Sequence, residues 1–133
     1  MAAELRIPVE SDQDIVTARQ EGRALASQLS FSPSDLTVLA AAISEVARNI
    51  VEYARRGEVR VWLTERNLRR GVVVVARDEG PGIPDVTLAM QDGFSTSGSL
   101  GLGLPGARRL MDEFEIQSEP GKGTTVTMRK WAR

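Results

Sequence analysis

Two side chains able to take part in chemistry, Glu45 and Asn49, lie four residues apart in a largely apolar segment. If that segment is a helix, residues at this spacing differ by about 40° around the axis and share one face. A carboxylate can accept a proton from a hydroxyl or a water, and a neutral carboxamide oxygen can ligate Mg²⁺. The pair is therefore a candidate general base beside a candidate metal ligand. A solvated helix face is the alternative, which these two residues alone leave open.

A second motif, Asp78-Glu79-Gly80-Pro81-Gly82, directly follows the apolar run Val72–Ala76. The ends of strands are where α/β sheets usually bind ligands. An aspartate there can accept a hydrogen bond from an exocyclic amine such as that of adenine. Gly80 and Gly82 permit positive φ and the close approach of a flat ring. The alternative interpretation is a tight turn built from glycine and proline.

A third motif is the glycine-rich segment 98–106, which leads directly into a predicted helix. Backbone N–H groups at a helix N-terminus, with roughly half a positive charge, bind phosphates. Gly101, Gly103 and Gly106 match G-x-G-x-x-G, but the dinucleotide interpretation needs a strand immediately before the motif. The whole uncharged segment 93–107 is interpreted instead as a lid over a phosphate site.

Several other classes of site are excluded by composition. Lys122 and Lys130 are the only lysines, so the sequence has no P-loop and no strand lysine of the eukaryotic kinase type. The chain has no cysteine and no histidine, which excludes thiol nucleophiles, Cys/His zinc centres and phosphohistidine chemistry. The 17 basic and 18 acidic residues nearly cancel, so no large field favours nucleic acid or a membrane. The longest apolar run, Val38–Ile43, is too short to span a bilayer, and we expect a cytoplasmic protein.

The hydrophobic periodicity predicts one domain over residues 1–133, an α/β two-layer sandwich. Its mixed, mainly antiparallel sheet should carry helices on one face. Val72–Ala76 is expected to be a central strand covered on both faces. A turn is expected at 67–71. The predicted strands are 4–9, 58–64, 72–76, 114–118 and 124–129, and the predicted helices are 12–29, 33–54, 86–91 and 104–113.

Four motifs together carry a resemblance: Glu45-x-x-x-Asn49, Asp78-x-Gly80-x-Gly82, Gly101-x-Gly103-x-x-Gly106 and Gly123-Thr124. In order and spacing they resemble the GHKL ATPase superfamily, which includes gyrase, MutL and histidine kinases. The segments 15–19, 44–50, 92–98 and 109–114 further resemble RsbT-type switch serine/threonine kinases. This resemblance extends over nearly the whole chain.

The resemblance implies ATP and Mg²⁺ as cofactors and a role for each motif. Asn49 would coordinate Mg²⁺, Asp78 would bind the adenine amine with help from Thr124, and Glu45 would be the general base. The glycines after Asp78 would line the adenine pocket, and the loop would wrap the phosphates through Gly101, Leu102, Gly103 and Gly106.

The resemblance also implies partners. An RsbT-type kinase phosphorylates a serine of an RsbS-like STAS-domain antagonist, held with an RsbR-like scaffold in a stressosome. It then activates an RsbU-like PP2C-type phosphatase. One alternative is the anti-sigma factor branch, SpoIIAB or RsbW. Another is a nucleotide-gated binding module with little catalysis. The uncharged segment ending in Leu-Gly-Leu-Pro-Gly favours the switch-kinase form. Histidine autokinase activity is not expected, because the chain has no histidine.

Overall fold

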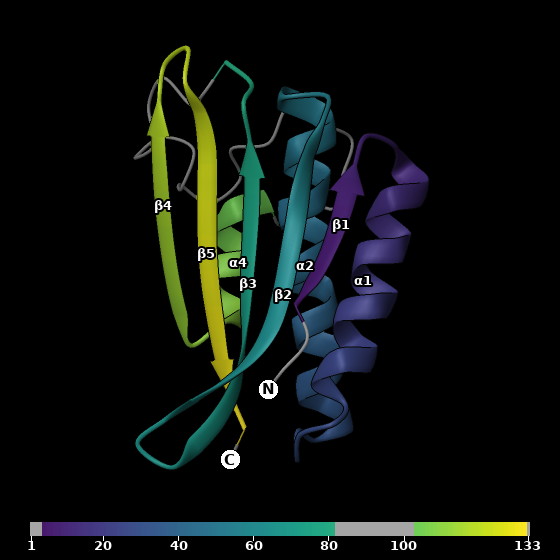
Figure 1. Ribbon diagram of the computed structural model, residues 1–133, viewed down its shortest axis with the longest axis vertical. Coiled ribbons are helices and arrows are strands. Elements are labelled where there is room, and N and C mark those ends of the chain that lie inside the picture. Colours follow the sequence, from purple (N-terminus) through teal and green to yellow (C-terminus); the bar gives the residue numbers. More distant parts are fainter. Residues whose placement is uncertain (1–3, 82–102, 133) are drawn as a thin grey trace.

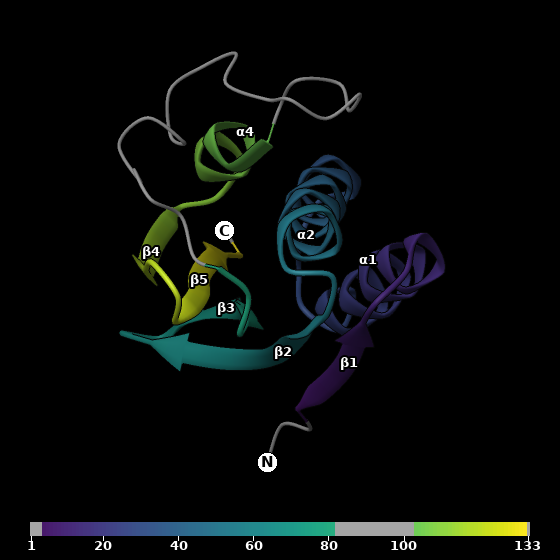
Figure 2. The same ribbon diagram turned by 90° about the horizontal axis from the view of Figure 1, so that it is seen from above.

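The computed structural model describes residues 4–81 and 103–132, which form one antiparallel sheet and three helices (Figure 1). The sheet order is β1-β2-β3-β5-β4. Figure 2 shows the three helices on the same face of the sheet, with α2 between α1 and α4. The elements are β1 (Leu5–Val9), α1 (Asp12–Ala26), α2 (Pro33–Tyr53), β2 (Gly57–Arg66), β3 (Arg69–Asp78), α4 (Gly103–Leu110), β4 (Glu113–Glu119) and β5 (Gly123–Trp131).

The first two helices begin at serine caps. Ser11 and Asp14 form a capping box at the start of α1, in which each side chain accepts from the other residue's backbone N–H. Ser32 Oγ accepts from the Asp35 backbone N–H at 3.0 Å, and Pro33 occupies the first turn of α2. These caps explain why both helices begin where the sequence predicts.

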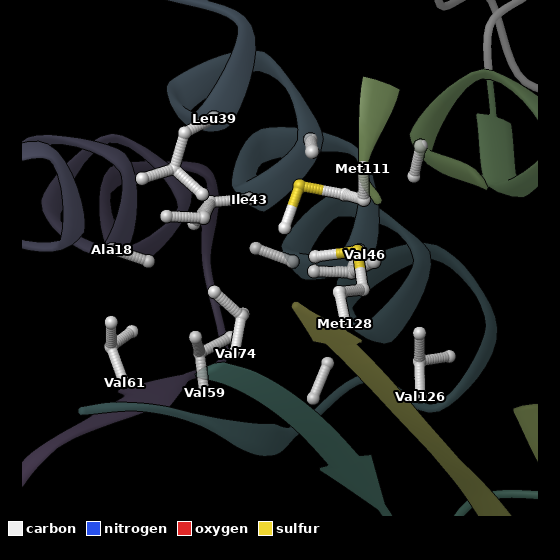
Figure 3. Close-up of a cluster of buried hydrophobic side chains, with 14 of the residues drawn as sticks. Ala18, Leu39, Ile43, Val46, Val59, Val61, Val74, Met111, Val126 and Met128 are labelled. Atoms are coloured by element: carbon white, nitrogen blue, oxygen red, sulfur yellow. The ribbon is translucent and has the colours of Figure 1, made fainter. Parts of the chain in front are cut away.

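A single hydrophobic core joins the helices to the inner face of the sheet (Figure 3). Leu39, Ile43 and Val46 of α2 are fully or almost fully buried against β-branched residues of the strands. Across the core, Val59 and Val74 have no exposed surface. This packing holds α2, and with it Glu45 and Asn49, in a fixed position above the strands.

The central strand differs from the expectation in one respect. β3 is indeed the middle strand, but within the described residues no helix covers its outer face (Figure 2). Val73 faces that side and is nonetheless only 4% exposed. It pairs in register with Trp62 on β2 and Arg129 on β5, whose long side chains shield it. Cross-strand neighbours, rather than a second layer, bury this residue.

The α/β sandwich is confirmed, with small differences in detail. All strand pairs among the described residues are antiparallel, so the parallel component of a mixed sheet is not found there. The first helix ends at Ala26 rather than at residue 29, and α4 ends at Leu110 rather than at 113. The turn expected at 67–71 is only two residues long, because both strands continue further. The predicted helix 86–91 lies outside the described residues.

A polar cluster on the outer face explains why β4 begins at Glu113. The Glu113 carboxylate accepts from Trp131 Nε1 at 2.9 Å and from Arg66 Nη1 at 2.7 Å. Arg129 approaches its other oxygen at 3.5 Å. These partners come from two other strands, β2 and β5, so Glu113 is fixed in the sheet instead of in the preceding helix.

We expect Glu113→Gln to remove part of the acid sensitivity of the fold. The hydrogen bond from Trp131 and the two guanidinium groups lower the pKa of Glu113 below its ordinary value of 4.5. Its contribution to stability is therefore present above the unfolded-state pKa and is lost as pH falls through the lower folded-state pKa. The variant should melt at most about 4 °C lower at pH 7, since the pair is partly exposed, and the difference should vanish in acid.

Thermal melts between pH 7 and pH 3 measure this difference. Glu115→Gln, on the same face of β4 but exposed, is the matched control and should melt like the native protein. A difference between native protein and Glu113→Gln that stays constant with pH would contradict the assignment.

Candidate functional site

The sequence-predicted site residues come from four elements that meet above the inner face of the sheet. Glu45 and Asn49 lie on α2, Asp78 ends β3, Thr124 lies at the start of β5, and Gly103 begins α4. Asp78 and Thr124 are direct register partners across the β3–β5 pair. Figure 2 shows α4 lying alongside α2 on the same face of the sheet.

Asp78 is 7% exposed and is oriented by backbone donors. Its Oδ1 accepts from the Gly80 N–H at 2.9 Å and from the Thr124 N–H at 3.3 Å. Both hydrogen bonds that the described residues donate to this carboxylate end on Oδ1. This geometry fits a carboxylate that accepts a hydrogen bond from the exocyclic amine of a ligand.

Thr124 has a hydroxyl partner that sequence reasoning missed. Ser118 Oγ lies 2.8 Å from Thr124 Oγ1 and donates to the Gly123 carbonyl at 3.1 Å. Because a serine hydroxyl has one proton, Thr124 must be the donor in the Ser–Thr pair. The register of β4 and β5, which pairs Ser118 with Thr124, is the signal that could have found it.

Two glycines near Asp78 occupy positions where an added side chain would not fit. A Cβ on Gly80 would lie 2.5 Å from the Ala54 Cβ, at the end of α2. Gly123 has φ +92, and a Cβ there would lie 2.2 Å from the Asp78 carbonyl oxygen. Two hollows in the described surface, of about 610 and 270 Å³, both reach Asp78. The larger is lined mainly by outer-face side chains such as Arg60 and Arg77, and Glu45, Asn49 and Thr124 are not part of its lining.

Glu45 is buried, so the solvated-face alternative is wrong for this residue. It is 6% exposed, and each carboxylate oxygen has a separate partner. Oε1 accepts from the Gly103 N–H at 3.0 Å, and Oε2 accepts from Arg48 Nη1 at 2.9 Å. Glu45 therefore ties α2 to the first residue of α4. Sequence reasoning missed Arg48, although the i,i+3 spacing was available as a signal.

Asn49 lies one turn after Glu45 and is partly exposed. A carboxamide oxygen at the edge of a site is a suitable hard donor for Mg²⁺, which keeps several waters and is usually completed by substrate phosphates. The described residues contain no cluster of three or more His, Cys, Asp or Glu side chains placed to hold a metal. A single carboxamide donor such as Asn49 is compatible with a Mg²⁺ ion whose other ligands are waters and phosphates.

Helix α4 is fixed at both ends by side chains from other elements. Glu45 accepts from its first N–H, and the Lys130 ammonium, 8% exposed, donates to the Leu110 carbonyl at 3.1 Å. Gly103 has φ +52, and Gly106 is buried within the helix. The other predicted loop residues, Gly82, Gly101 and Leu102, lie outside the described residues, as does most of the segment interpreted as a lid.

Among the described residues, no helix is long and apolar enough to cross a bilayer. Trp131 packs in the Glu113 cluster, at the end of the β3–β5 pair away from Asp78. Trp62 is half-buried on the outer face of the sheet.

Comparison with known proteins places this site in a family. A family model described as the histidine kinase-like ATPase domain matches residues 8–130. The chain is 46% identical, over 96% of both chains, to the serine/threonine-protein kinase RsbT of Bacillus subtilis. It is 34% identical to the anti-sigma F factor of Caldanaerobacter subterraneus, over 86% of this chain and 82% of that one.

A solved structure supports the fold independently. The mycobacterial sensor histidine kinase MprB superposes with a TM-score of 0.57 over 97% of this chain and 99% of that chain, at 20% identity. At this identity the likeness concerns the fold alone. Together with the matches above, it confirms the resemblance that the four motifs carry, and the chain therefore belongs to the histidine kinase-like ATPase family, in its RsbT-type branch.

Proposed function

We propose that the chain is a serine/threonine protein kinase that transfers the γ-phosphoryl group of Mg-ATP to a serine of a partner protein. The observation that supports this most directly is the position of Glu45. A buried carboxylate touches the first residue of the glycine-loop helix, one turn before the candidate Mg²⁺ ligand. Proton acceptor, metal ligand and phosphate-binding helix are thereby brought together.

ATP with Mg²⁺ supplies the activated phosphoryl group. The side chains of this protein position the substrates and accept the proton. Asp78, with Thr124, holds the adenine ring through its amine. Asn49 would hold the metal, and the N-terminal end of α4 would face the phosphates. Glu45 takes the proton from the incoming serine hydroxyl as the serine Oγ–phosphorus bond forms and the bond to the bridging oxygen of ADP breaks.

The partners belong to the same proposal. The acceptor is an RsbS-like STAS-domain protein held with an RsbR-like scaffold in a cytoplasmic stressosome, and the partner activated afterwards is an RsbU-like PP2C-type phosphatase. A second candidate function, an anti-sigma factor kinase, draws on the 34% identity to an anti-sigma F factor. Direct binding of a sigma factor would distinguish this candidate from the first.

The test is phosphotransfer in a purified mixture of this protein, labelled ATP, Mg²⁺ and the STAS protein. We expect label on a serine of the STAS protein. A STAS variant with that serine replaced by alanine is the control for the acceptor, and Asp78→Asn is the control for the nucleotide site. Nucleotide binding without any transfer would favour the nucleotide-gated binding module instead.

Asn49→Ala is expected to weaken the binding of Mg-ATP by on the order of 10- to 100-fold, because it removes a direct ligand of the metal. Asn49→Asp keeps an oxygen donor at the same place and should lose less. Calorimetric titration with ATP measures both, with Mg²⁺ and with a chelator. An equal loss of affinity for Asn49→Ala in the presence of the chelator would show that the side chain does not act through the metal.

A further inference from the structure

The β2–β3 hairpin turns in two residues, Asn67 and Leu68, whose φ angles are +51 and +68. A two-residue turn with both central residues at positive φ is of type I′, which favours Asn-Gly. Asn67 suits its position. Leu68 does not, because the Cβ of an ordinary residue is strained in the left-handed region.

Leu68 is also the most exposed large hydrophobic residue of the described chain, at 93%. The next, Tyr53, is 47% exposed. A leucine at this position therefore contributes neither to the core nor to the turn. Strained residues kept at exposed positions are enriched at functional sites, which motivates a search for a role in recognition.

The residues beside Leu68 are cationic and are held in place. Arg66 and Arg69 lie over the ring of Trp131, at 4.8 and 5.9 Å from its centroid. Arg66 also donates to Glu113. Arg70 is 70% exposed, and its nearest carboxylate, Glu65, is 3.9 Å away. The tip therefore presents one apolar side chain surrounded by three arginines. Because contacts with Trp131 and Glu113 hold part of this cluster in place, the tip loses little conformational entropy on binding.

We propose that this hairpin tip, residues 66–70, is a docking site for a protein that presents an apolar recess bordered by carboxylates. Leu68 is the anchor that enters the recess, and Arg69 and Arg70 face the acidic border. A small buried anchor surrounded by polar contacts is the usual arrangement of an interface hot spot. Charge complementarity identifies the partner surface as acidic.

The place of the tip in the fold identifies which partner it binds, on the basis of the proposed function. β3 runs from Arg69 at the tip to Asp78 at the nucleotide site, so the two lie at opposite ends of one strand, about 30 Å apart (Figure 1). A protein seated on the tip leaves the nucleotide site open. The tip therefore binds the partner that is activated, the PP2C-type phosphatase, and not the STAS protein whose serine must reach the γ-phosphate.

Leu68→Gly tests the proposal through two effects of opposite sign. Glycine removes the backbone strain, so the melting temperature should rise by about 3 to 5 °C. The same change removes the anchor, so the affinity for the phosphatase should fall roughly tenfold or more. Phosphorylation of the STAS protein should stay unchanged. Arg70→Gln should slow association with the phosphatase and make it less dependent on salt.

Arg55→Gly is the matched control, because Arg55 has φ +71 and lies just after α2, away from the hairpin. It should raise the melting temperature to a similar extent and leave phosphatase affinity within twofold. Unchanged phosphatase affinity of Leu68→Gly would overturn the hairpin proposal. Loss of STAS phosphorylation in that variant would assign the tip to the substrate and overturn the proposed partner. If the native protein neither phosphorylates the STAS protein nor binds the phosphatase, the proposed function itself is refuted.

Discussion

Glu45→Gln should slow phosphotransfer to the STAS protein by roughly 10²- to 10⁴-fold, with the affinity for Mg-ATP largely kept. A carboxamide cannot accept the serine proton, so the step that needs a base is lost. Its oxygen can still accept from the Gly103 N–H, as the native carboxylate does. The loss should therefore fall on kcat and not on nucleotide binding.

The choice of glutamine matters because Glu45 has a structural contact as well as the proposed chemical role. Both substitutions leave Arg48 without its carboxylate partner, but only alanine would also untie α2 from the start of α4. We therefore expect Glu45→Ala to lose nucleotide affinity in addition to rate. Glu52→Gln, two turns further along α2 and exposed, is the control and should transfer phosphate normally. Native kcat in Glu45→Gln would exclude Glu45 as the base.

Gly123→Ala is expected to destabilise the fold by about 2 to 4 kcal/mol and to weaken ATP binding. Gly123 has φ +92, and the added Cβ would lie 2.2 Å from the Asp78 carbonyl oxygen and 2.8 Å from the Glu79 Cα. Relief of this overlap must displace the backbone at Asp78. The Asp78 carboxylate, which we propose binds adenine, would therefore move together with the strand end.

Gly121 provides a matched control in the same turn. It has φ +79, but a Cβ there would meet nothing within 4 Å. Gly121→Ala should therefore cost only the backbone strain, on the order of 1 kcal/mol, and leave ATP binding unchanged. Urea unfolding and nucleotide titration measure the two effects. Equal losses for both variants would show that strain alone, and not the contact with Asp78, makes Gly123 necessary.

The secondary structure could be predicted because local patterns dominate it. Serine caps, apolar residues at helical spacing and the alternation from Glu58 to Thr64 place α1, α2 and β2 correctly. The end of α4 could not be predicted in the same way. Glu113 continues the helical pattern, but its partners Trp131 and Arg66 come from distant strands, and these tertiary contacts override local preference.

The site could be predicted as a set of residues but not as a geometry. Spacing alone puts Glu45 and Asn49 on one face of a helix. Spacing does not show that α4 covers that face, which is why the burial of Glu45 was not foreseen. Ser118 was missed for the same reason, since it joins Thr124 only through strand register. The strand pairing that assembles the site cannot be inferred from any single motif.

Helix α4 has only eight residues, fewer than an isolated helix needs to be stable in water. Its persistence depends on the packing of Leu104 and Ala107 in the core and on two side chains from other elements, the carboxylate of Glu45 at one end and the ammonium of Lys130 at the other. Any event that draws Glu45 toward a hydroxyl proton must therefore loosen the first turn of this helix. Under the proposed function, catalysis and release of the spent nucleotide are mechanically linked, because the proposed proton acceptor also holds the first turn of α4.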